Sequence, residues 1–136
     1  MKAAAVLYVR RLDPMRAFYR ECFGLEIAET AKDYCVLESG AWTLSLVVVP
    51  DAVAATLQAS VPPARREGTP VKLTFGVPSI DDLRPVMARL GGQVDPGETQ
   101  WEFRGLTHCD CLDPEGNVVQ MTEPLADRAR PAALPG

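Results

Sequence analysis

The chain has 136 residues, of which 47% are hydrophobic and 24% charged, and its formal net charge is −4. This length and composition fit one globular domain with its own core. The Lys and Arg residues are scattered rather than gathered in a stripe, which argues against nucleic acid as a partner. No apolar run is long enough to cross a membrane and no signal peptide opens the sequence, so we expect a cytoplasmic protein that binds no membrane.

The first strand-like run, residues 3–9, leads to a helix that we expect to begin at Asp13-Pro14. Asp is a good N-cap residue, and Pro suits the first helical position. Apolar side chains then recur with the spacing of one helix face: Met15, Phe18, Tyr19, Cys22 and Phe23. Gly24 is expected to end the helix. Three strand-like runs follow, at residues 25–30, 34–38 and 43–49.

A second strand and helix repeat this design. Residues 71–77 form the strand-like run, Ser79 and Asp82 have the spacing of a capping box, and the helix is expected to stop at Gly91-Gly92. Without a gap, Val9 aligns with Val77, Leu12 with Ile80 and Gly24 with Gly92, a constant offset of 68 residues. The offset indicates an internal duplication. Strand-like runs follow at residues 93–94, at 100–103 leading to 108–112, and at 118–122, so that the second half is about six residues longer than the first.

Residues 51–70 are expected to link the halves, with a short alanine-rich helix within 52–61 and an exposed stretch at 62–68. Residues 126–136 have no apolar periodicity and are expected to form a flexible tail. We therefore expect a single domain over residues 1–125, with one module at 3–50 and a second at 71–124.

Two motifs resemble those of the vicinal oxygen chelate superfamily of glyoxalases, bleomycin resistance proteins and extradiol dioxygenases. Residues 17–25 (AFYRECFGL) resemble its FYxxxLGL helix end, and residues 113–117 (DPEGN) resemble its DPxGN turn. The resemblance covers roughly residues 3 to 124. It implies an α+β fold of two tandem βαβββ modules, whose largely antiparallel sheet curls into a cup with the helices outside. It also implies a homodimer, which in some relatives forms by exchange of halves.

Metal enzymes of that superfamily hold their ion with four side chains, usually His, Gln or Glu, from the first and last strands of each half. The matching positions here are Ala4, Leu46, Lys72 and Gln120. Ala and Leu carry no donor atom, and lysine must lose its proton before it can coordinate. Divalent metals need several oxygen or nitrogen ligands, so we expect no metal and no other cofactor. The C-x-C pair of Cys109 and Cys111 has no cluster of histidines to complete a zinc site and favours structural thiols.

Alternation along the strands predicts which side chains face the cup. The first half offers apolar groups, among them Tyr8, Leu44, Leu46 and Val48, and the second offers Lys72, Thr74 and Gln120. Apolar walls with a few polar groups are typical of a small-molecule pocket. Trp42, Trp101 and Phe103 are expected near its rim, where aromatic rings can stack on a ligand. The predicted ligand-binding residues are therefore Tyr8, Trp42, Leu46, Lys72, Thr74, Trp101, Phe103 and Gln120.

Three functions stay open from the sequence. The first is a metal-free protein that sequesters a small amphipathic or aromatic compound, as the bleomycin-resistance branch does. The second is a metal-dependent enzyme, either a lactoylglutathione lyase-like isomerase or an extradiol dioxygenase. The third is a metal-free lyase or isomerase in which the catalytic residue is His108, the only histidine, or Lys72. For Lys72, an ion pair with a nearby carboxylate is the simpler interpretation.

Overall fold

The structure, a computed structural model, describes residues 2–54 and 61–125. The first half contains β1 (Ala3–Val9), α1 (Leu12–Phe23), β2 (Glu26–Thr30), β3 (Tyr34–Glu38), β4 (Trp42–Val48) and α2 (Asp51–Ala54). The second half contains β5 (Leu73–Gly76), α3 (Ile80–Arg89), β6 (Gln93–Val94), the 3-10 turn η1 (Gly97–Thr99), β7 (Trp101–Phe103), β8 (Leu106–Leu112) and β9 (Val118–Pro124). The predicted α+β class is confirmed. Residues 55–60, where the linker helix was expected to continue, and the tail 126–136 lie outside the described part of the chain.

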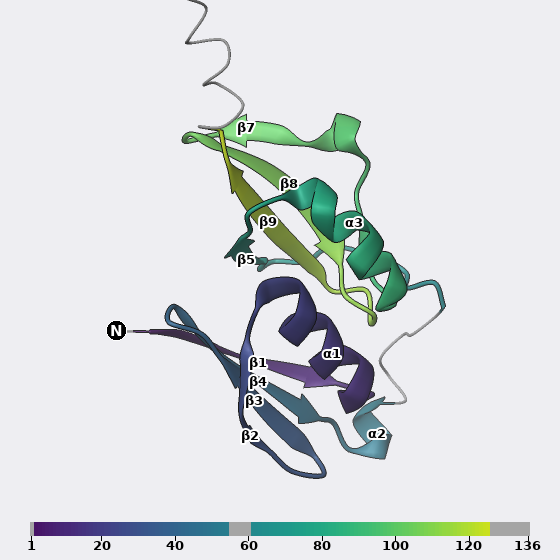
Figure 1. The fold of residues 1–136 in the computed structure, drawn as a ribbon. Helices are drawn as coiled ribbons and strands as arrows, with labels where there is room; N and C mark the ends of the chain where they lie inside the picture. The colour runs from purple at the N-terminus through teal and green to yellow at the C-terminus, as the bar shows by residue number, and fades with distance from the viewer. Residues whose placement is uncertain (1, 55–60, 126–136) are drawn as a thin grey trace, which may run out of the picture.

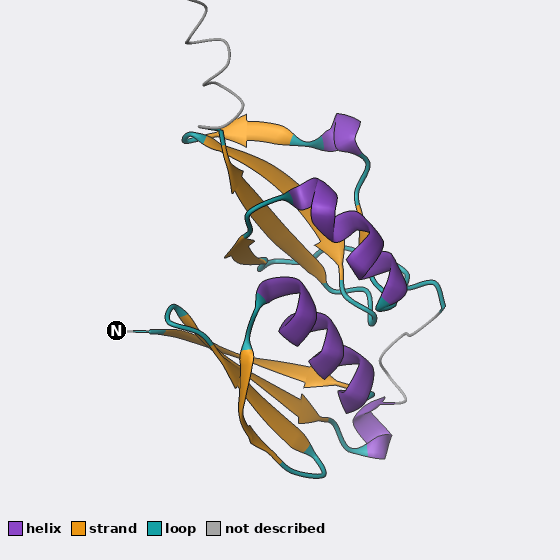
Figure 2. Ribbon diagram, in the orientation of Figure 1, coloured by secondary structure: helices purple, strands orange, loops and turns teal. Residues whose placement is uncertain are grey.

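Each half forms its own sheet. The strand order is β1-β4-β3-β2 in the first sheet and β5-β9-β8-β6 in the second, where β7 also pairs with β8. In both halves the first strand runs parallel to the last, and the other neighbours are antiparallel. The helices α1 and α3 begin at Leu12 and Ile80, the offset that the sequence duplication predicts. In Figure 1 both helices lie in front of their sheets, and Figure 2 shows the same layering by type of element.

One core joins the two halves on the helix side. Phe75 of β5 stacks on Phe23 of α1, with ring centroids 4.3 Å apart, and also contacts Trp42 of β4 at 5.7 Å. Met15 and Phe18 of α1 are fully buried in the same cluster. Complete burial of side chains of this size contributes roughly 1.5–3 kcal/mol each. The shared core therefore fixes one half against the other.

The start of α1 differs from the prediction. The N-cap residue is Arg11, which makes no side-chain capping bond, and Asp13 lies inside the first turn. The cap comes instead from the second half, because the buried carboxylate of Glu115 accepts the backbone N–H groups of Arg10 and Arg11 at 2.9–3.0 Å. In α3 the predicted cap is confirmed, since Ser79 Oγ accepts the N–H of Asp82. Glu115 thus holds the N–H groups of the N-cap residue of α1 and of the residue before it, whereas Ser79 accepts an N–H group within the first turn of α3.

The DPEGN turn does more than reverse the chain. Asp113 Oδ1 accepts the backbone N–H groups of Glu115 and Asn117, as a turn residue is expected to do. Its Oδ2 also accepts the hydroxyl of Tyr19 on α1 at 2.7 Å. The interpretation of Asp113 as a turn residue alone is therefore incomplete. Burial raises the pKa of Asp113, and burial together with this carboxylate raises the pKa of Tyr19.

The strands after α3 form a hairpin, as β2 and β3 do in the first half. The strands β7 and β8 are joined by Arg104 and Gly105, whose φ angles are 52° and 77°. Because φ is positive at both positions, the chain reverses tightly and β7 folds back along β8. The runs expected at residues 100–103 and 108–112 are thus two strands of one hairpin, which places β7 on the outer part of the second sheet.

Candidate functional site

A line of contacts crosses the face of the second sheet opposite its helix, which we call the helix-free face. Lys72 Nζ lies 2.8 Å from Asp110 Oδ2. Gln120 Nε2 donates to Asp110 Oδ1 at 3.4 Å, and Gln120 Oε1 lies 2.9 Å from His108 Nδ1. The His108 ring stacks on Trp101, with 5.3 Å between centroids and 16° between planes. We call these five residues the polar cluster.

Strand register explains why these side chains meet. Asp110 of β8 is paired with Gln120 of β9, and directly paired residues point to the same face. His108 shares that face because it precedes Asp110 by two residues. Thr74 of β5 is paired with Gln120 in turn, and Lys72 precedes Thr74 by two residues. The register thus brings Lys72, Thr74 and Gln120, three of the predicted ligand-binding residues, to one face.

The β7–β8 hairpin adds aromatic surface to this face. Trp101 is paired with His108, and Phe103 lies 6.0 Å from the same imidazole between ring centroids. Lys72 Nζ lies 5.8 Å from the centroid of the Trp101 ring, within the range of a cation–π contact. Trp101 and Phe103 are 40% and 59% exposed. Their rings are therefore available to a ligand.

Both ring nitrogens of His108 face acceptors. Nδ1 lies 2.9 Å from Gln120 Oε1, and Nε2 lies 3.1 Å from the backbone carbonyl oxygen of Phe103. The Gln120 amide is held in this orientation because its other end donates to Asp110. A neutral imidazole has one N–H and one lone pair, and here both nitrogens face protein atoms rather than open space. To remove a proton from a ligand, His108 would first have to give up one of these contacts.

The ion pair presents its cation to solvent. The side chain of Lys72 is 38% exposed, whereas that of Asp110 is 13% exposed. Lys72 and Gln120 occupy one carboxylate oxygen each, so that Asp110 is satisfied from within the cluster. An ammonium group has three N–H donors, of which this carboxylate takes one. A ligand can therefore reach the ammonium group of Lys72 more easily than the carboxylate of Asp110.

The helix-free face of the first sheet is mainly apolar. Val6 and Tyr8 of β1 are 58% and 63% exposed. Their parallel partners on β4 are Ser45 and Val47, which are half-buried. Val6 also lines a cavity of about 260 Å³ together with Val71 and Leu73, so that the β1 and β5 edges lie beside each other. An apolar and a polar surface thus adjoin along this seam.

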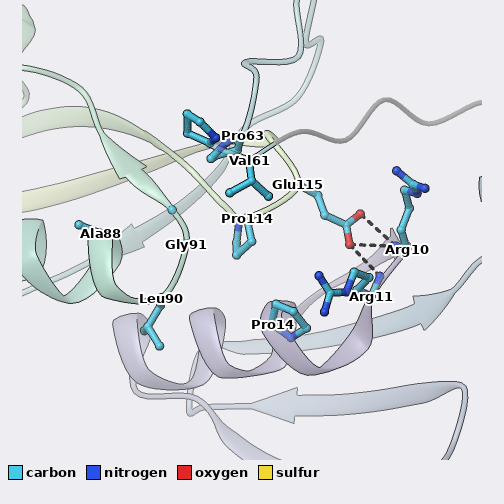
Figure 3. Close-up of a pocket in the computed structure, with 12 residues that line it drawn as sticks. Arg10, Arg11, Pro14, Val61, Pro63, Ala88, Leu90, Gly91, Pro114 and Glu115 are labelled. Atoms are coloured by element: carbon cyan, nitrogen blue, oxygen red, sulfur yellow. Dashed lines mark hydrogen bonds between the residues drawn. The ribbon is translucent and has the colours of Figure 1, made fainter.

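A larger cavity of about 520 Å³ lies on the helix side of the molecule. Figure 3 shows it between the start of α1 and the end of α3, with Arg11 and Pro14 on one side and Leu90 and Gly91 on the other. The carboxylate of Glu115 at this cavity is already engaged in capping α1. None of the residues lining this cavity belongs to the polar cluster.

Comparison with known proteins identifies the family. The sequence pattern of the Glyoxalase/Bleomycin resistance protein/Dioxygenase superfamily matches residues 3–121. The chain belongs to this superfamily. None of the curated proteins compared with the sequence matches it.

Solved structures show the same fold at low sequence identity. A glyoxalase/bleomycin resistance protein/dioxygenase family enzyme from Burkholderia phytofirmans PsJN is 22% identical, with a TM-score of 0.68 over 90% of this chain and 98% of that one. A genomically encoded fosfomycin resistance protein from Listeria monocytogenes is 15% identical, with a TM-score of 0.64 over 90% and 92%. A lactoylglutathione lyase from Agrobacterium tumefaciens is 23% identical, with a TM-score of 0.56 over 90% and 92%.

The ligand positions of the superfamily do not fit a metal ion in this chain. The offset of 68 residues matches Thr74 with Val6, and the strand pairings match Gln120 with Ser45, the partner of Val6. The fourth position is therefore Ser45 rather than Leu46. The donor set becomes one alanine, one serine hydroxyl, a paired lysine and Gln120, whose amide oxygen faces His108. Such a set offers no anionic ligand to a divalent cation. In the part of the chain that the structure describes, no three His, Cys, Asp or Glu side chains are grouped as a metal site requires.

Two predicted ligand-binding residues lie in the core instead. Leu46 is fully buried and paired with Leu7 of β1, on the face that packs against α1. Trp42 shares that face and packs against Phe75. The expectation that β4 turns Leu44, Leu46 and Val48 to the ligand is wrong by one residue, and a shift of one residue exchanges the faces of a strand. The alternation within β4 puts Thr43 and Ser45 on one face and Leu44 and Leu46 on the other. The error arose because Leu46 was matched to Gln120, whereas the strand pairings match Ser45 to it.

Two contributors to these sites were missed from the sequence. Asp110 belongs to no sequence motif, yet it joins Lys72 to Gln120. Glu115 was taken as part of a turn, and no local pattern signals that it caps a helix about 100 residues earlier. The four cysteines are buried free thiols, and burial raises the pKa of Cys22 to about 12.

Proposed function

We propose that this protein binds a small, partly aromatic molecule on its helix-free face without a metal ion. The observation that carries the proposal is the polar cluster, in which an exposed lysine and an exposed indole are held in place by Asp110, Gln120 and His108. Apolar surface with a few oriented polar groups is typical of small-molecule sites. The adjoining apolar surface of Val6 and Tyr8 supplies the rest of such a site.

Binding is a better match to these contacts than catalysis. His108 has both ring nitrogens engaged, and Lys72 is paired with Asp110. A general base needs a lone pair within reach of the proton that it removes. The similarity to a fosfomycin resistance protein is compatible with a small-molecule ligand.

We further propose that a second copy of the chain covers part of this face. Val6, Tyr8 and Phe103 of this face are each more than half exposed, which is uncommon for large apolar residues unless a ligand or partner covers them. Light scattering at micromolar concentration should report the mass of a dimer, and a monomer would contradict the proposal. We also propose that the protein works in the cytoplasm, where cysteines commonly remain free, as these four are in the structure. Among the described residues no helix is long and apolar enough to cross a membrane.

Calorimetric titration with a panel of bicyclic aromatic compounds, before and after addition of Mn²⁺, Ni²⁺ or Zn²⁺, tests the proposed function. We expect at least one compound to bind, and expect Trp101→Ala to weaken binding about tenfold or more, as the loss of a buried aromatic anchor does. A second variant at the same site can replace Phe103, whose ring is also exposed. Turnover or binding that depends on added metal would overturn the proposal.

A further inference from the structure

The polar cluster also indicates the charge of the ligand. We infer that the ligand is a planar aromatic compound with an anionic group, which Lys72 binds while the ring lies near Trp101. This inference rests on the proposed function, because it names the class of compound that the helix-free face takes.

The positions of Lys72 and Trp101 suit the two parts of one such molecule. The ammonium nitrogen lies 5.8 Å from the centroid of the indole, so that both groups are within the reach of a single aromatic acid. Both are exposed on the same face, at 38% for the lysine side chain and 40% for Trp101. A carboxylate on Lys72 would therefore leave its attached ring beside Trp101.

The remaining donors and acceptors favour an anion over a cation. Asp110 is the acidic member of the cluster, but its oxygens are taken by Lys72 and Gln120 and its side chain is only 13% exposed. A cationic ligand would have to displace Lys72 to reach it. Thr74 lies on the same face as Lys72 and is exposed, so that its hydroxyl adds a neutral donor to this face.

The internal contacts of the cluster limit how far these groups can move. Lys72 is held by Asp110, and Trp101 is stacked on His108, which Gln120 and the Phe103 carbonyl hold from both sides. A group that is positioned before binding loses less conformational entropy on binding. His108 is therefore a positioning residue, which sets the plane of Trp101 without contacting the ligand through a free nitrogen.

Three naphthalene derivatives of nearly the same shape test the inference: 1-naphthoate is anionic, 1-naphthamide neutral and 1-naphthylmethylammonium cationic. We expect the anion to bind about fivefold more tightly than the amide at pH 7.5 and low salt, because an ion pair to a partly exposed lysine contributes up to about a fivefold gain in affinity. The preference should shrink as salt screens the charge.

Lys72→Met should abolish the preference for 1-naphthoate over 1-naphthamide. The double variant Lys72→Met, Asp110→Asn removes both charges, so that no carboxylate is left without its partner. Lys32→Met is the matched control, since it makes the same change of net charge in the turn between β2 and β3. His108→Asn should weaken the binding of all three compounds alike, because it removes the imidazole that sets the plane of the Trp101 ring and leaves the charge of Lys72 unchanged.

The outcomes separate the inference from the proposed function. Equal affinity for the three compounds, with loss of binding in Trp101→Ala, would overturn the anion inference and retain the proposed binding site. Tightest binding of the cation, or an equal loss in Lys32→Met, would also overturn the inference. No binding of any compound by wild type would contradict both.

Discussion

The two halves of this protein agree on their helix-side faces and differ on their helix-free faces. On the helix side, Val9 matches Val77 and Leu7 matches Phe75, and all four are apolar. On the helix-free side, Val6 matches Thr74 and Ser45 matches Gln120, so that the first half is mainly apolar and the second carries the polar cluster. The packed face has to stay apolar for the fold to persist, whereas the other face is free to change. Function in this molecule is therefore expected where the duplicated halves differ.

The largest expected effect tests the assignment of faces on β4. Leu46→Ala should lower the free energy of unfolding by about 2–5 kcal/mol, because it removes a fully buried side chain. Val6→Ala on the opposite face should change it by roughly 0.5 kcal/mol, as exposed substitutions usually do. Urea unfolding of both variants checks this prediction. Only a small loss of unfolding free energy in Leu46→Ala would show that this side chain faces the ligand side of the sheet rather than the core.

The second prediction compares alanine substitutions at Gly24 and Gly92, which occupy equivalent positions in the two halves. A Cβ atom at Gly92 would lie 2.5 Å from Phe18 Cε2 and 2.6 Å from the Leu112 carbonyl oxygen, so Gly92→Ala should cost about 3 kcal/mol. At Gly24 there is open space, but its φ of 67° disfavours any residue with a Cβ. Gly24→Ala should therefore cost about 1–2 kcal/mol. Thermal unfolding of the pair measures the difference, and a greater loss at Gly24 would contradict the proposed packing between the halves.

The third effect compares a distant helix cap with a local one. Glu115→Ala leaves the N–H groups of Arg10 and Arg11 without their acceptor and should cost about 2 kcal/mol. Ser79→Ala removes one bond at the start of α3 and should cost about 1 kcal/mol. Glu115→Gln, which keeps an acceptor oxygen, should fall between wild type and Glu115→Ala. Equal stability of Glu115→Ala and wild type would show that α1 does not need this cap.

The smallest effect concerns the contact of Tyr19 with Asp113. Burial raises the pKa of Tyr19 above 10, so its contribution to stability is complete below the unfolded pKa and is lost as the pH rises toward the folded one. The stability advantage of wild type over Tyr19→Phe should therefore shrink by about 0.7 kcal/mol between pH 9.5 and 10.5, because full ionisation of the unfolded phenol would change it by about 1.4 kcal/mol per pH unit and the phenol is about half ionised over this interval. Urea unfolding at the two pH values measures it. If the stability difference between wild type and Tyr19→Phe were the same at both pH values, the Tyr19 hydroxyl would not be buried against Asp113.

The sequence predicted most of the fold because its signals were local or periodic. The helix faces, Ser79 as a cap, Gly24 as a stop and the offset of 68 residues all follow from short-range patterns. The ligand-side residue of β4 was misplaced although Thr43 and Ser45 alternate with Leu44 and Leu46, because the number of extra residues in the second half before β9 is not fixed by any local pattern. Glu115 and Asp113 could not be placed on α1, because their partners are about 100 residues away and depend on how the halves pack.

The most direct test of the central claim is a calorimetric titration of 1-naphthoate into chelator-treated protein, repeated after addition of Mn²⁺, Ni²⁺ or Zn²⁺. We predict saturable binding with an unchanged dissociation constant in every case, because Lys72 and Trp101 supply the site. Binding that appears only after a metal is added would contradict the claim.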